Sequence, residues 1–580
     1  MRILGLVGAT HDSGLALLTD GIPELVLEEE RFNRDKRTKR FPRKSLDVLH
    51  KQIGDLGQID VMTTPWDMTR LRRSFLRAVA GRLPWSLSLI SERSHTPQSN
   101  DIVLLNGYLN RKLKKIPYVT KPPPLVNVSH HDAHAATFFV SPFEEAVVLV
   151  MDGFGDDAAT SAYHGRGNRL ERLWHTDIFN SVGIVYTFVT KYLGFAGFSD
   201  EGKVMALAAY GSDTYVEAFR ELIWPTPDGR YKVNQDYFSY DAFGELRPFK
   251  RRFFDVFGPP RQPGEPMQDR HRDVARGLQV LTEDIVLHVA RALREATGAR
   301  HLCLSGGVAL NCVANMRILE DAGFERIWVP PCASDTGAPL GSALWHHHQT
   351  LGNPRTFELT HPYYGPPYRD GEIQSALDAA GLSAERMDTP DLLERVAADL
   401  AAGKIVGWFQ GRSEMGPRAL GNRSILADPR RAEMKDVINN RIKHREPFRP
   451  FAPAVLIERA GEFFHIGQPD PFMTLAPRVR AEKAHHIPAA IHVDGTARIQ
   501  TVDRDANPRY YGVIEAFGKL TGVPVLLNTS FNRQEPIVER PREAISCYLR
   551  SGIDVLVLGN YYTADRNSDA GQVSEREVAL

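Results

Sequence analysis

The feature that most constrains the fold is a duplicated order of strands and turns in the first third of the chain. "RILGLVGATHDSGLALLTDGIPELVLEEE" predicts a strand, a polar turn with His11 and Asp12, a second strand, a tight turn at 20–21 and a third strand. "AVVLVMDGFGDDAATSAYHGRGNRLERLWHTD" repeats this order, with turns at 152–155 and 165–168. Because each first turn carries carboxylates and backbone N–H groups, the pair is typical of hairpins that hold the phosphates and cation of a nucleotide. Two unrelated meanders are the alternative.

Length and composition narrow the class of protein. A chain of 580 residues is too long for a single hydrophobic core, so we expect two large domains. Lysine plus arginine and aspartate plus glutamate number 71 each, so no overall field would attract nucleic acid or a membrane, and we expect neither as a partner. Four cysteines without a C-x-x-C pair are too few for a disulfide framework and favour a reducing cytoplasm. Without a signal-like leader or an uninterrupted apolar stretch of membrane-spanning length, the sequence predicts a soluble, cytoplasmic protein.

A histidine-rich stretch, "NVSHHDAHAATFF" at 127–139, is the first candidate for a metal site. His130 and His134 are four residues apart, which places them on the same face of a helix and makes them a pair of potential metal ligands. The alternative is a helix start with polar caps and solvated histidines.

Two further loops follow strands and precede helices. "RHLCLSGGVALNCVANMRI" places 305–307, Ser-Gly-Gly, between a strand and a helix beginning near Ala309, where glycines let the backbone approach an anionic ligand. A plain strand-to-helix connection is the alternative. "IWVPPCASDTGAPLGSALW" presents Asp335 ahead of a helix of small residues, either as a functional carboxylate or as the cap of that helix.

Several long strings together resemble a known family. "THDSGLALL", "HHDAHAA", "VMDGFGD", "GKVMALAAYG", "SGGVALN", "ASDTGAPLGSA", "GRSEMGPRALGNRSILADPR", "KHREPFRPFAPAV" and "PVLLNTSFN" are similar, in order and spacing, to the O-carbamoyltransferase family of antibiotic and nodulation-factor biosynthesis. The resemblance covers roughly residues 1–565. Met415 and Gly14 depart mildly from the family pattern, and neither removes a proposed functional group.

The resemblance implies an α/β protein of two domains. Residues 1–360 would form a duplicated, actin/sugar-kinase-like domain for metal and nucleotide binding and carbamoyl transfer, similar to the tRNA threonylcarbamoyladenosine transferase. Residues 361–580 would form an α/β domain that makes carbamoyl-adenylate, similar to the tRNA threonylcarbamoyl-adenylate synthase. Composition alone also places a boundary in this region, at the Pro/Gly/Tyr-rich stretch 360–372.

The resemblance also implies a metal site in the first domain. Its ligands would be His130, His134, Asp152 and Asp335, and the family implies iron. Two imidazoles with two carboxylates fit Fe²⁺, Mn²⁺ or Zn²⁺, and Mg²⁺ is expected with ATP. The neighbouring His131 points elsewhere on a helix and is expected to be structural. The residues expected to bind nucleotide are Gly153, Gly155, Lys203, Gly306, Gly307 and Asn311.

The second domain contains a high density of basic residues in loops rich in glycine and proline. These residues are Arg412, Arg418, Arg423, Arg430, Arg441, Lys443, Arg445 and Arg449. Such loops suit the binding of triphosphate and carbamoyl phosphate, whereas a solvated basic face is the alternative. Apolar neighbours are expected to bury Arg418 and Arg449. With the family's further residues, the proposed ATP and carbamoyl phosphate ligands are Arg418, Lys443, Arg449, Arg498, Asn528, Ser530 and Asn532.

The implied activity is an ATP-dependent O-carbamoyltransferase acting on a hydroxyl of a small-molecule natural product. Its substrates would be ATP and carbamoyl phosphate, with Lys443 catalytic in activation and His11 the general base for the acceptor. A turn histidine paired with Asp12 is the alternative for His11. A tRNA-modifying enzyme and a non-catalytic actin/sugar-kinase-like module are the competing classes. The acceptor alcohol, a polyketide, an aminoglycoside or another sugar, is left open.

Three segments lie outside these motifs. The basic run 31–44, with eight lysines and arginines, is expected to form a lid loop rather than a tRNA or membrane patch. Within the insert 50–125, Leu71, Phe75 and Val79 form an apolar stripe that is expected to pack on the core rather than shape an acceptor pocket. The histidines 346–348 are expected at a solvated helix end rather than in a metal-binding tail.

Overall fold

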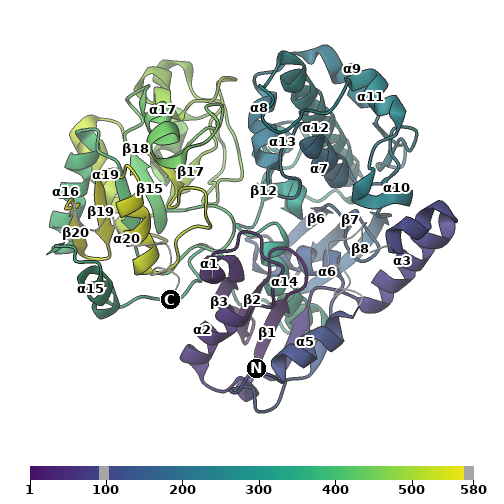
Figure 1. The fold of residues 1–580 in the computed structure, drawn as a ribbon, viewed down its shortest axis with the longest axis horizontal. Helices are drawn as coiled ribbons and strands as arrows, with labels where there is room; N and C mark the ends of the chain where they lie inside the picture. Colours follow the sequence, from purple (N-terminus) through teal and green to yellow (C-terminus); the bar gives the residue numbers. More distant parts are fainter. Residues whose placement is uncertain (91–103, 567–580) are drawn as a thin grey trace. The chain divides into compact units, whose positions relative to one another are not determined.

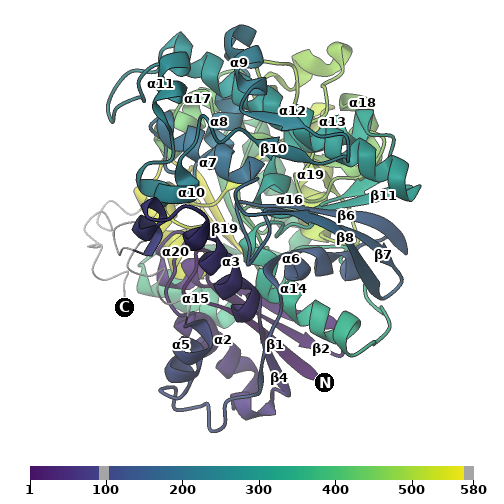
Figure 2. The same cartoon turned by 90° about the vertical axis from the view of Figure 1, so that its right-hand side faces the viewer.

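The computed structural model describes residues 1–90 and 104–566 and divides into two compact units. Unit 1 contains Met1–Glu29 and Arg37–Leu359, and unit 2 contains Glu30–Lys36 together with the chain from Thr360 onward. In Figures 1 and 2, unit 1 is coloured from purple to teal, and unit 2 from green to yellow except for its purple segment Glu30–Lys36. The assignment of Glu30–Lys36 to unit 2 is a feature that the sequence did not predict.

Two five-stranded sheets of identical topology form the centre of unit 1. The first has the order β3-β2-β1-β4-β5, in which β1 is antiparallel to β2 and parallel to β4. The second has the order β8-β7-β6-β11-β12, in which β6 is antiparallel to β7 and parallel to β11. Strand for strand, one sheet repeats the other, so the predicted duplication and the actin/sugar-kinase-like α/β fold are confirmed. The strands are β1 (Arg2–Val7), β2 (Gly14–Thr19), β3 (Ile22–Glu28), β4 (Val61–Thr64), β5 (Leu125–Asn127), β6 (Glu145–Met151), β7 (Thr160–Arg166), β8 (Arg169–Thr176), β11 (His301–Ser305) and β12 (Arg326–Trp328).

Two short helices pack against each other and against the two sheets. The helix α6 (His130–Ala135) contacts β6 and β7, and α14 (Ala338–Leu344) contacts β1 and β2. A Cβ placed on Gly341 would lie 1.9 Å from the carbonyl oxygen of Ala133, and one placed on Gly5 would lie 1.9 Å from that of Pro339. The small residues of these segments therefore permit backbone-to-backbone packing that fixes α6 relative to α14.

This packing predicts a large effect of one methyl group. We expect Gly341→Ala to lower the melting temperature, because its Cβ cannot be accommodated without backbone movement, and overpacking costs about 1–3 kcal/mol. Gly202→Ala is the matched control: Gly202 lies in α8 (Glu201–Ala208), no heavy atom is within 4 Å of its added Cβ, and alanine is the better helix former. Circular dichroism melts measure both variants, and equal melting temperatures would contradict the tight contact.

One long helix of unit 1, α12 (Asp269–Thr297), contacts β6 and the neighbouring helices α7, α8, α9 and α13 (Figures 1 and 2). It ends at Gly298, whose left-handed backbone (φ 68°) closes the last turn. The other elements are α2 (Arg43–Ile53), α3 (Met68–Gly81), α5 (Leu105–Leu113), α7 (Val182–Tyr192), α9 (Val216–Arg220), β9 (Ile223–Pro225), β10 (Tyr231–Val233), α10 (Tyr240–Phe243), α11 (Arg251–Phe257) and α13 (Cys312–Asp321).

Unit 2 is built on an eight-stranded mixed sheet of order β13-β20-β19-β14-β15-β18-β16-β17. Trp408 and Phe409 are consecutive in β14 and therefore point to opposite faces. Trp408 belongs to an apolar cluster with α16 and α19, and Phe409 to a cluster with α15, α17 and α20, so both faces are covered. The elements are α15 (Asp370–Ala379), β13 (Glu385–Arg386), α16 (Thr389–Ala401), β14 (Val406–Phe409), β15 (Arg423–Ala427), α17 (Met434–Ile438), β16 (Ala452–Leu456), α18 (Ala460–Phe463), β17 (Gln500–Val502), α19 (Pro508–Thr521), β18 (Val525–Ser530), α20 (Pro541–Arg550), β19 (Val555–Leu558) and β20 (Tyr561–Thr563).

The expected solvated helix end at His346, His347 and His348 is wrong. These residues form part of a π-helical turn (Trp345–Thr350) that continues α14, and all three are buried. The same turn reaches β8, where the Gln349 side chain accepts a hydrogen bond from the Leu170 backbone N–H (2.9 Å). Sequence periodicity does not reveal this contact, nor the packing of the Phe139 ring on the His348 ring, whose centroids are 5.0 Å apart.

The basic run 31–44 is not one loop. It begins in α1 (Glu29–Asn33), where Arg31 is buried and donates to the carbonyl oxygen of Gly416 (2.7 Å), and it ends in the first turn of α2. Arg34 donates to the carbonyl oxygen of Ile537 (2.8 Å). The lid-loop interpretation therefore does not hold for 31–36, whose arginines serve the packing of unit 2.

The insert 50–125 is only partly packed on the core. Leu71, Phe75 and Val79 are half-buried on α3, whereas Leu76 is 66% exposed. Residues 91–103 of this insert lie outside the described residues. In the part of the chain that is described, no helix combines the length and the apolar character needed to cross a bilayer.

Candidate metal centre and a cationic site in unit 2

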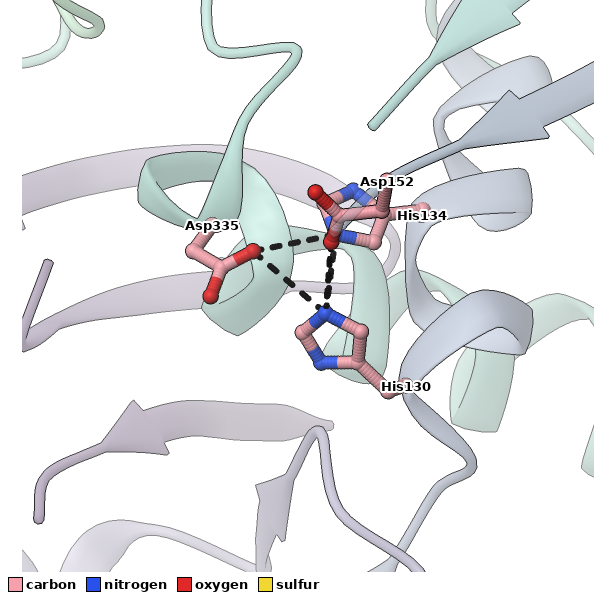
Figure 3. Close-up of side chains that lie close together, drawn as sticks. All are labelled: His130, His134, Asp152 and Asp335. Carbon is pink, nitrogen blue, oxygen red and sulfur yellow. Dashed lines mark hydrogen bonds and ion pairs between the residues drawn. The ribbon is translucent and has the colours of Figure 1, made fainter. Parts of the chain in front are cut away.

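Two histidines and two aspartates from separate elements meet in unit 1 (Figure 3). His130 and His134 lie one turn apart on α6, Asp152 follows β6, and Asp335 begins the short turn that leads into α14. One ligand atom from each lies within 4.8 Å of the others. The fold thus brings together the four residues that the sequence proposed, because the contact of α6 with α14 joins the two halves of the duplicated unit.

The ligand atoms face a common point. His130 Nε2 lies 3.1 Å from Asp152 Oδ2 and 3.4 Å from Asp335 Oδ1, and His134 Nε2 lies 3.2 Å from His130 Nε2 and 3.3 Å from Asp335 Oδ1. Ser334 occupies the helix-cap position, so the cap interpretation of Asp335 is not supported. Two imidazoles and two carboxylates in this arrangement fit a divalent cation such as Fe²⁺, Mn²⁺ or Zn²⁺.

The second ring nitrogen of each histidine is within hydrogen-bonding reach of an oxygen away from the cluster. His130 Nδ1 lies 3.3 Å from the carbonyl oxygen of Pro65, and His134 Nδ1 lies 3.4 Å from Ser305 Oγ. Donation from Nδ1–H to these oxygens would leave the Nε2 lone pairs directed at the cluster, which is the tautomer that a metal ligand requires.

Charge compensation accounts for the burial of the cluster. Burial lowers the pKa of His130, but Asp335 and Asp152 outweigh burial and raise this pKa well above its usual value. Burial raises the pKa of Asp152, but His130 and His134 outweigh it and hold this pKa well below its usual value. Protons and a cation therefore compete for the same Nε2 lone pairs, so metal affinity is expected to fall as pH falls.

Glycines of two turns line the cluster. The backbone N–H of Gly307 donates to Asp152 Oδ1 (3.1 Å), and Gly306 has φ 88°, with its Cβ position 2.3 Å from the Met151 carbonyl oxygen. A Cβ on Gly155 would lie 2.8 Å from the His131 ring. Only glycine fits such approaches, so these turns can bring backbone N–H groups to a ligand beside the carboxylates.

His11 lies at the edge of this cluster. Its Nδ1 is 3.2 Å from Asp12 Oδ2 and 3.7 Å from Asp335 Oδ2, and about a third of its side chain is exposed (34%). Burial lowers the pKa of His11, but Asp335 and Asp12 outweigh burial and raise it to about 9. The geometry is compatible with both interpretations of His11, as a general base and as a turn histidine. Its ring is paired with Asp12 and also lies beside Asp335, a proposed metal ligand.

Three other residues of unit 1 make contacts elsewhere. His131 Nδ1 lies 2.8 Å from Ser161 Oγ, so this ring faces away from the cluster as expected. Lys203 Nζ lies 3.1 Å from Asp200, and the Asn311 side chain caps α13, accepting from Ala314 N–H (3.1 Å). Both side chains therefore have partners within the protein. The nucleotide-binding roles of Lys203 and Asn311 stay predictions.

Sequence reasoning missed two neighbours of His130. Asp156 Oδ2 accepts a hydrogen bond from the His130 backbone N–H (2.7 Å), and the Trp66 ring stacks on the His130 ring with centroids 4.3 Å apart. Burial raises the pKa of Asp156 to about 7. Asp156 could have been predicted from the sequence, because it is a further carboxylate of the "DGFGDD" turn. Trp66 lies in no motif that would have indicated a place near the metal site.

A buried lysine forms the centre of the cationic site in unit 2. Lys443 Nζ donates to the carbonyl oxygens of Ser530 (2.5 Å) and Asn532 (2.8 Å) and to Asn532 Oδ1 (2.8 Å). Burial, with a smaller contribution from Arg445, lowers the pKa of Lys443 well below its usual value. An anion placed beside this ammonium group would be favoured, because its partners supply dipoles but no full negative charge.

Further cations surround this lysine. Burial lowers the pKa of Arg445 to about 9, and the positive charges of Arg449 and Arg498 lower it further. Arg498 Nε and Asn528 Oδ1 are buried without a hydrogen-bond partner in the described structure. Arg418 and Arg449 are half-buried, less than the sequence predicted.

The other arginines of these loops have structural partners. Arg412 and Arg423 donate to the carbonyl oxygens of Gly365 (2.6 Å) and Gln410 (2.6 Å). Arg430 pairs with Asp428 (2.7 Å) and Arg441 with Asp554 (2.5 Å). Part of the basic density therefore stabilises the unit through backbone and carboxylate partners.

Comparisons with known proteins span both units. The chain matches the family model described as Carbamoyltransferase N-terminus over residues 2–344 and the one described as Carbamoyltransferase C-terminus over 397–565. Nodulation protein NolO of Bradyrhizobium diazoefficiens is 43% identical, covering 76% of this chain and 79% of NolO. Nodulation protein NolNO of Sinorhizobium fredii is 38% identical, covering 98% and 81%.

Among solved structures, HypF of T. kodakarensis is 13% identical with a TM-score of 0.34, covering 61% of this chain and 48% of HypF.

The two family models match most of both units in sequence order, and the relatives match along most of their own length. The chain therefore belongs to the carbamoyltransferase family of enzymes.

Proposed function

We propose that this protein is an ATP-dependent O-carbamoyltransferase that divides its reaction between the two units. The observation that carries the proposal is the cluster of His130, His134, Asp152 and Asp335 with its glycine turns in unit 1, accompanied by a separate cationic site around Lys443 in unit 2. One site suits transfer of a carbonyl group, and the other suits a reaction among phosphates.

Activation would take place in unit 2. Carbamoyl phosphate is cleaved by water to carbamate and phosphate, and a carbamate oxygen then attacks the α-phosphorus of ATP. The products are carbamoyl-adenylate and pyrophosphate. Lys443, Arg418, Arg449 and Arg498 would neutralise the converging negative charges, with Mg²⁺ on ATP. Asn528, Ser530 and Asn532 would hydrogen-bond the nucleotide or the carbamoyl group.

Transfer would take place in unit 1. The glycine turns would hold the adenylate phosphate, and a divalent cation bound by the four ligands would supply Lewis acidity at the carbamoyl carbonyl. The acceptor hydroxyl oxygen attacks the carbamoyl carbon, AMP leaves, and the hydroxyl proton passes to Nε2 of His11 in its neutral form, which becomes more abundant as pH rises toward the His11 pKa of about 9. Carbamoyl-adenylate is a mixed anhydride that water destroys, so transfer must outpace its release to solvent.

Mass spectrometry tests this proposal. The enzyme, ATP and carbamoyl phosphate are incubated with a set of candidate alcohols or with tRNA, and a gain of one carbamoyl group is sought. We expect the gain on an alcohol, with AMP and pyrophosphate formed alongside it. Modification of tRNA, or release of ADP in place of AMP, would contradict the proposal.

His11→Asn is expected to slow transfer by about 10²–10⁴, the range that general-base catalysis supplies, while pyrophosphate release continues. Synthetic carbamoyl-adenylate should not rescue the variant, because the missing step follows this intermediate. His164→Asn, on β7, is the control and should transfer normally. Rescue by the intermediate would place His11 in activation, and a loss of only a few-fold would support the structural pairing with Asp12.

A further inference from the structure

The proposed reaction gives no role to a cavity of about 420 Å³ in unit 1. Its lining includes five cationic side chains, and no acidic side chain is among its described lining residues. The cations are Lys39, Arg40, Arg43, Lys112 and Lys115. The local charge is notable because the whole chain has a net charge of zero. A volume of this size suits a small molecule, and the charge selects an anion.

The floor of the cavity is apolar. Phe41, Tyr108 and Ile116 contribute to the lining and are 8%, 9% and 3% exposed. The Phe41 and Tyr108 rings meet edge to face with centroids 6.3 Å apart, and Lys112 Nζ lies 5.4 Å from the Tyr108 ring centroid. A ligand that combines an anionic group with an apolar or planar part would therefore contact both the cations and the floor.

One segment of the cavity lining is hydrogen-bonded to the turn that contains His11. The backbone N–H of Ala9 donates to the carbonyl oxygen of Lys39 (3.0 Å), and that of Ser13 donates to the carbonyl oxygen of Thr38 (3.2 Å). The segment 38–41 thus flanks the β1–β2 turn with its backbone and lines the cavity with the side chains of Lys39, Arg40 and Phe41. The segment 38–41 therefore links the lining of the cavity to the turn that carries His11.

We infer that this cavity is a recognition subsite for the acceptor, and that the acceptor is an alcohol bearing a phosphate group next to an apolar or planar part. The inference rests on the proposed function, because it needs an acceptor that reaches His11. A phosphate dianion is complementary to this cationic lining, in which Arg43 also pairs with Asp47 (3.1 Å), whereas a polycationic aminoglycoside would be repelled by it. The cavity therefore distinguishes among the acceptor classes that the sequence left open.

Phenyl phosphate is a probe that combines both features. Its binding is measured by isothermal titration calorimetry on the full-length protein, with the nucleotide sites saturated by α,β-methylene-ATP. We expect Lys112→Glu with Lys115→Glu to weaken binding at least tenfold, because each lost charge-assisted hydrogen bond alone accounts for about that factor. Lys114→Glu is the matched control, since Lys114 is exposed, lies between the two lysines in sequence and does not line the cavity. Inorganic phosphate and phenol should each bind more weakly than phenyl phosphate.

The same variants separate this inference from the proposed function. Carbamoyl phosphate-dependent ATP–pyrophosphate exchange should be unchanged in Lys112→Glu/Lys115→Glu, because the cavity acts on the acceptor alone. Equal phenyl phosphate affinity in this variant, in Lys114→Glu and in wild type would overturn the subsite while leaving the proposed function standing. Tighter binding of a short RNA than of phenyl phosphate, lost in the double variant, would overturn it in favour of a nucleic-acid surface.

Discussion

His130→Ala combined with His134→Ala is expected to remove the metal and carbamoyl transfer together, while pyrophosphate release continues at the wild-type rate. The two imidazoles supply half of the ligand set, and Asp152 and Asp335 alone would leave two carboxylates near each other without compensation. Loss of one electrostatic stabiliser of a developing oxyanion costs about 10²–10³ in rate, so loss of the bound cation should cost at least that much.

His131→Ala is the control for this experiment, because His131 lies in the same helix but contacts Ser161. Elemental analysis of the purified proteins gives the metal content, and a melting curve verifies that each variant is folded. Metal content and transfer activity like wild type in the folded double variant would show that the four residues are not the metal site.

Lys443→Met and Arg418→Ala are each expected to reduce pyrophosphate release by about 10²–10³ while the metal stays bound. Lys443 places a single ammonium group among the oxygens of Ser530 and Asn532, and its side chain is buried. Methionine preserves the volume of the side chain and removes the charge. Arg418 is half-buried, so its truncation removes a cation at little cost in packing.

Lys519→Ala is the matched control, because this exposed lysine pairs with Glu515 on α19, away from the basic loops in sequence. Addition of synthetic carbamoyl-adenylate should restore transfer in the Lys443 and Arg418 variants, since unit 1 is unchanged. Normal pyrophosphate release in both variants would remove the group around Lys443 from the chemistry.

The duplicated sheets could be predicted from sequence because their information is local. Alternating strands and tight turns such as Asp20-Gly21 specify hairpins within about thirty residues, and both copies form as expected. His130 and His134 were visible as a pair for the same reason, since helix geometry fixes their relation. Asp152 and Asp335 were each recognisable as a carboxylate in a turn. Their proximity in the fold depends on the contact of α6 with α14, and only the family resemblance predicted that they belong to one site.

The features that the sequence did not reveal depend on contacts between distant segments. The sequence predicted Arg31 and Arg34 to belong to a basic loop. Their hydrogen-bond partners are carbonyl groups 385 and 503 residues away in the chain, and a local pattern of charges cannot predict such partners. Likewise, Pro65 and Ser305, which lie opposite the outer nitrogens of the two histidines, come from the ends of other strands. A side chain's partner across a fold is set by topology, so it follows from the sequence only after the sheets are known.

The most direct test of a reaction divided between two units is ATP–pyrophosphate exchange in the absence of any acceptor. Radiolabelled pyrophosphate is incubated with the enzyme and ATP, with and without carbamoyl phosphate, and its incorporation into ATP is followed. We predict exchange that requires carbamoyl phosphate, persists in His130→Ala/His134→Ala and is lost in Lys443→Met. Exchange that proceeds without carbamoyl phosphate, or that disappears with the metal ligands and survives without Lys443, would contradict the division.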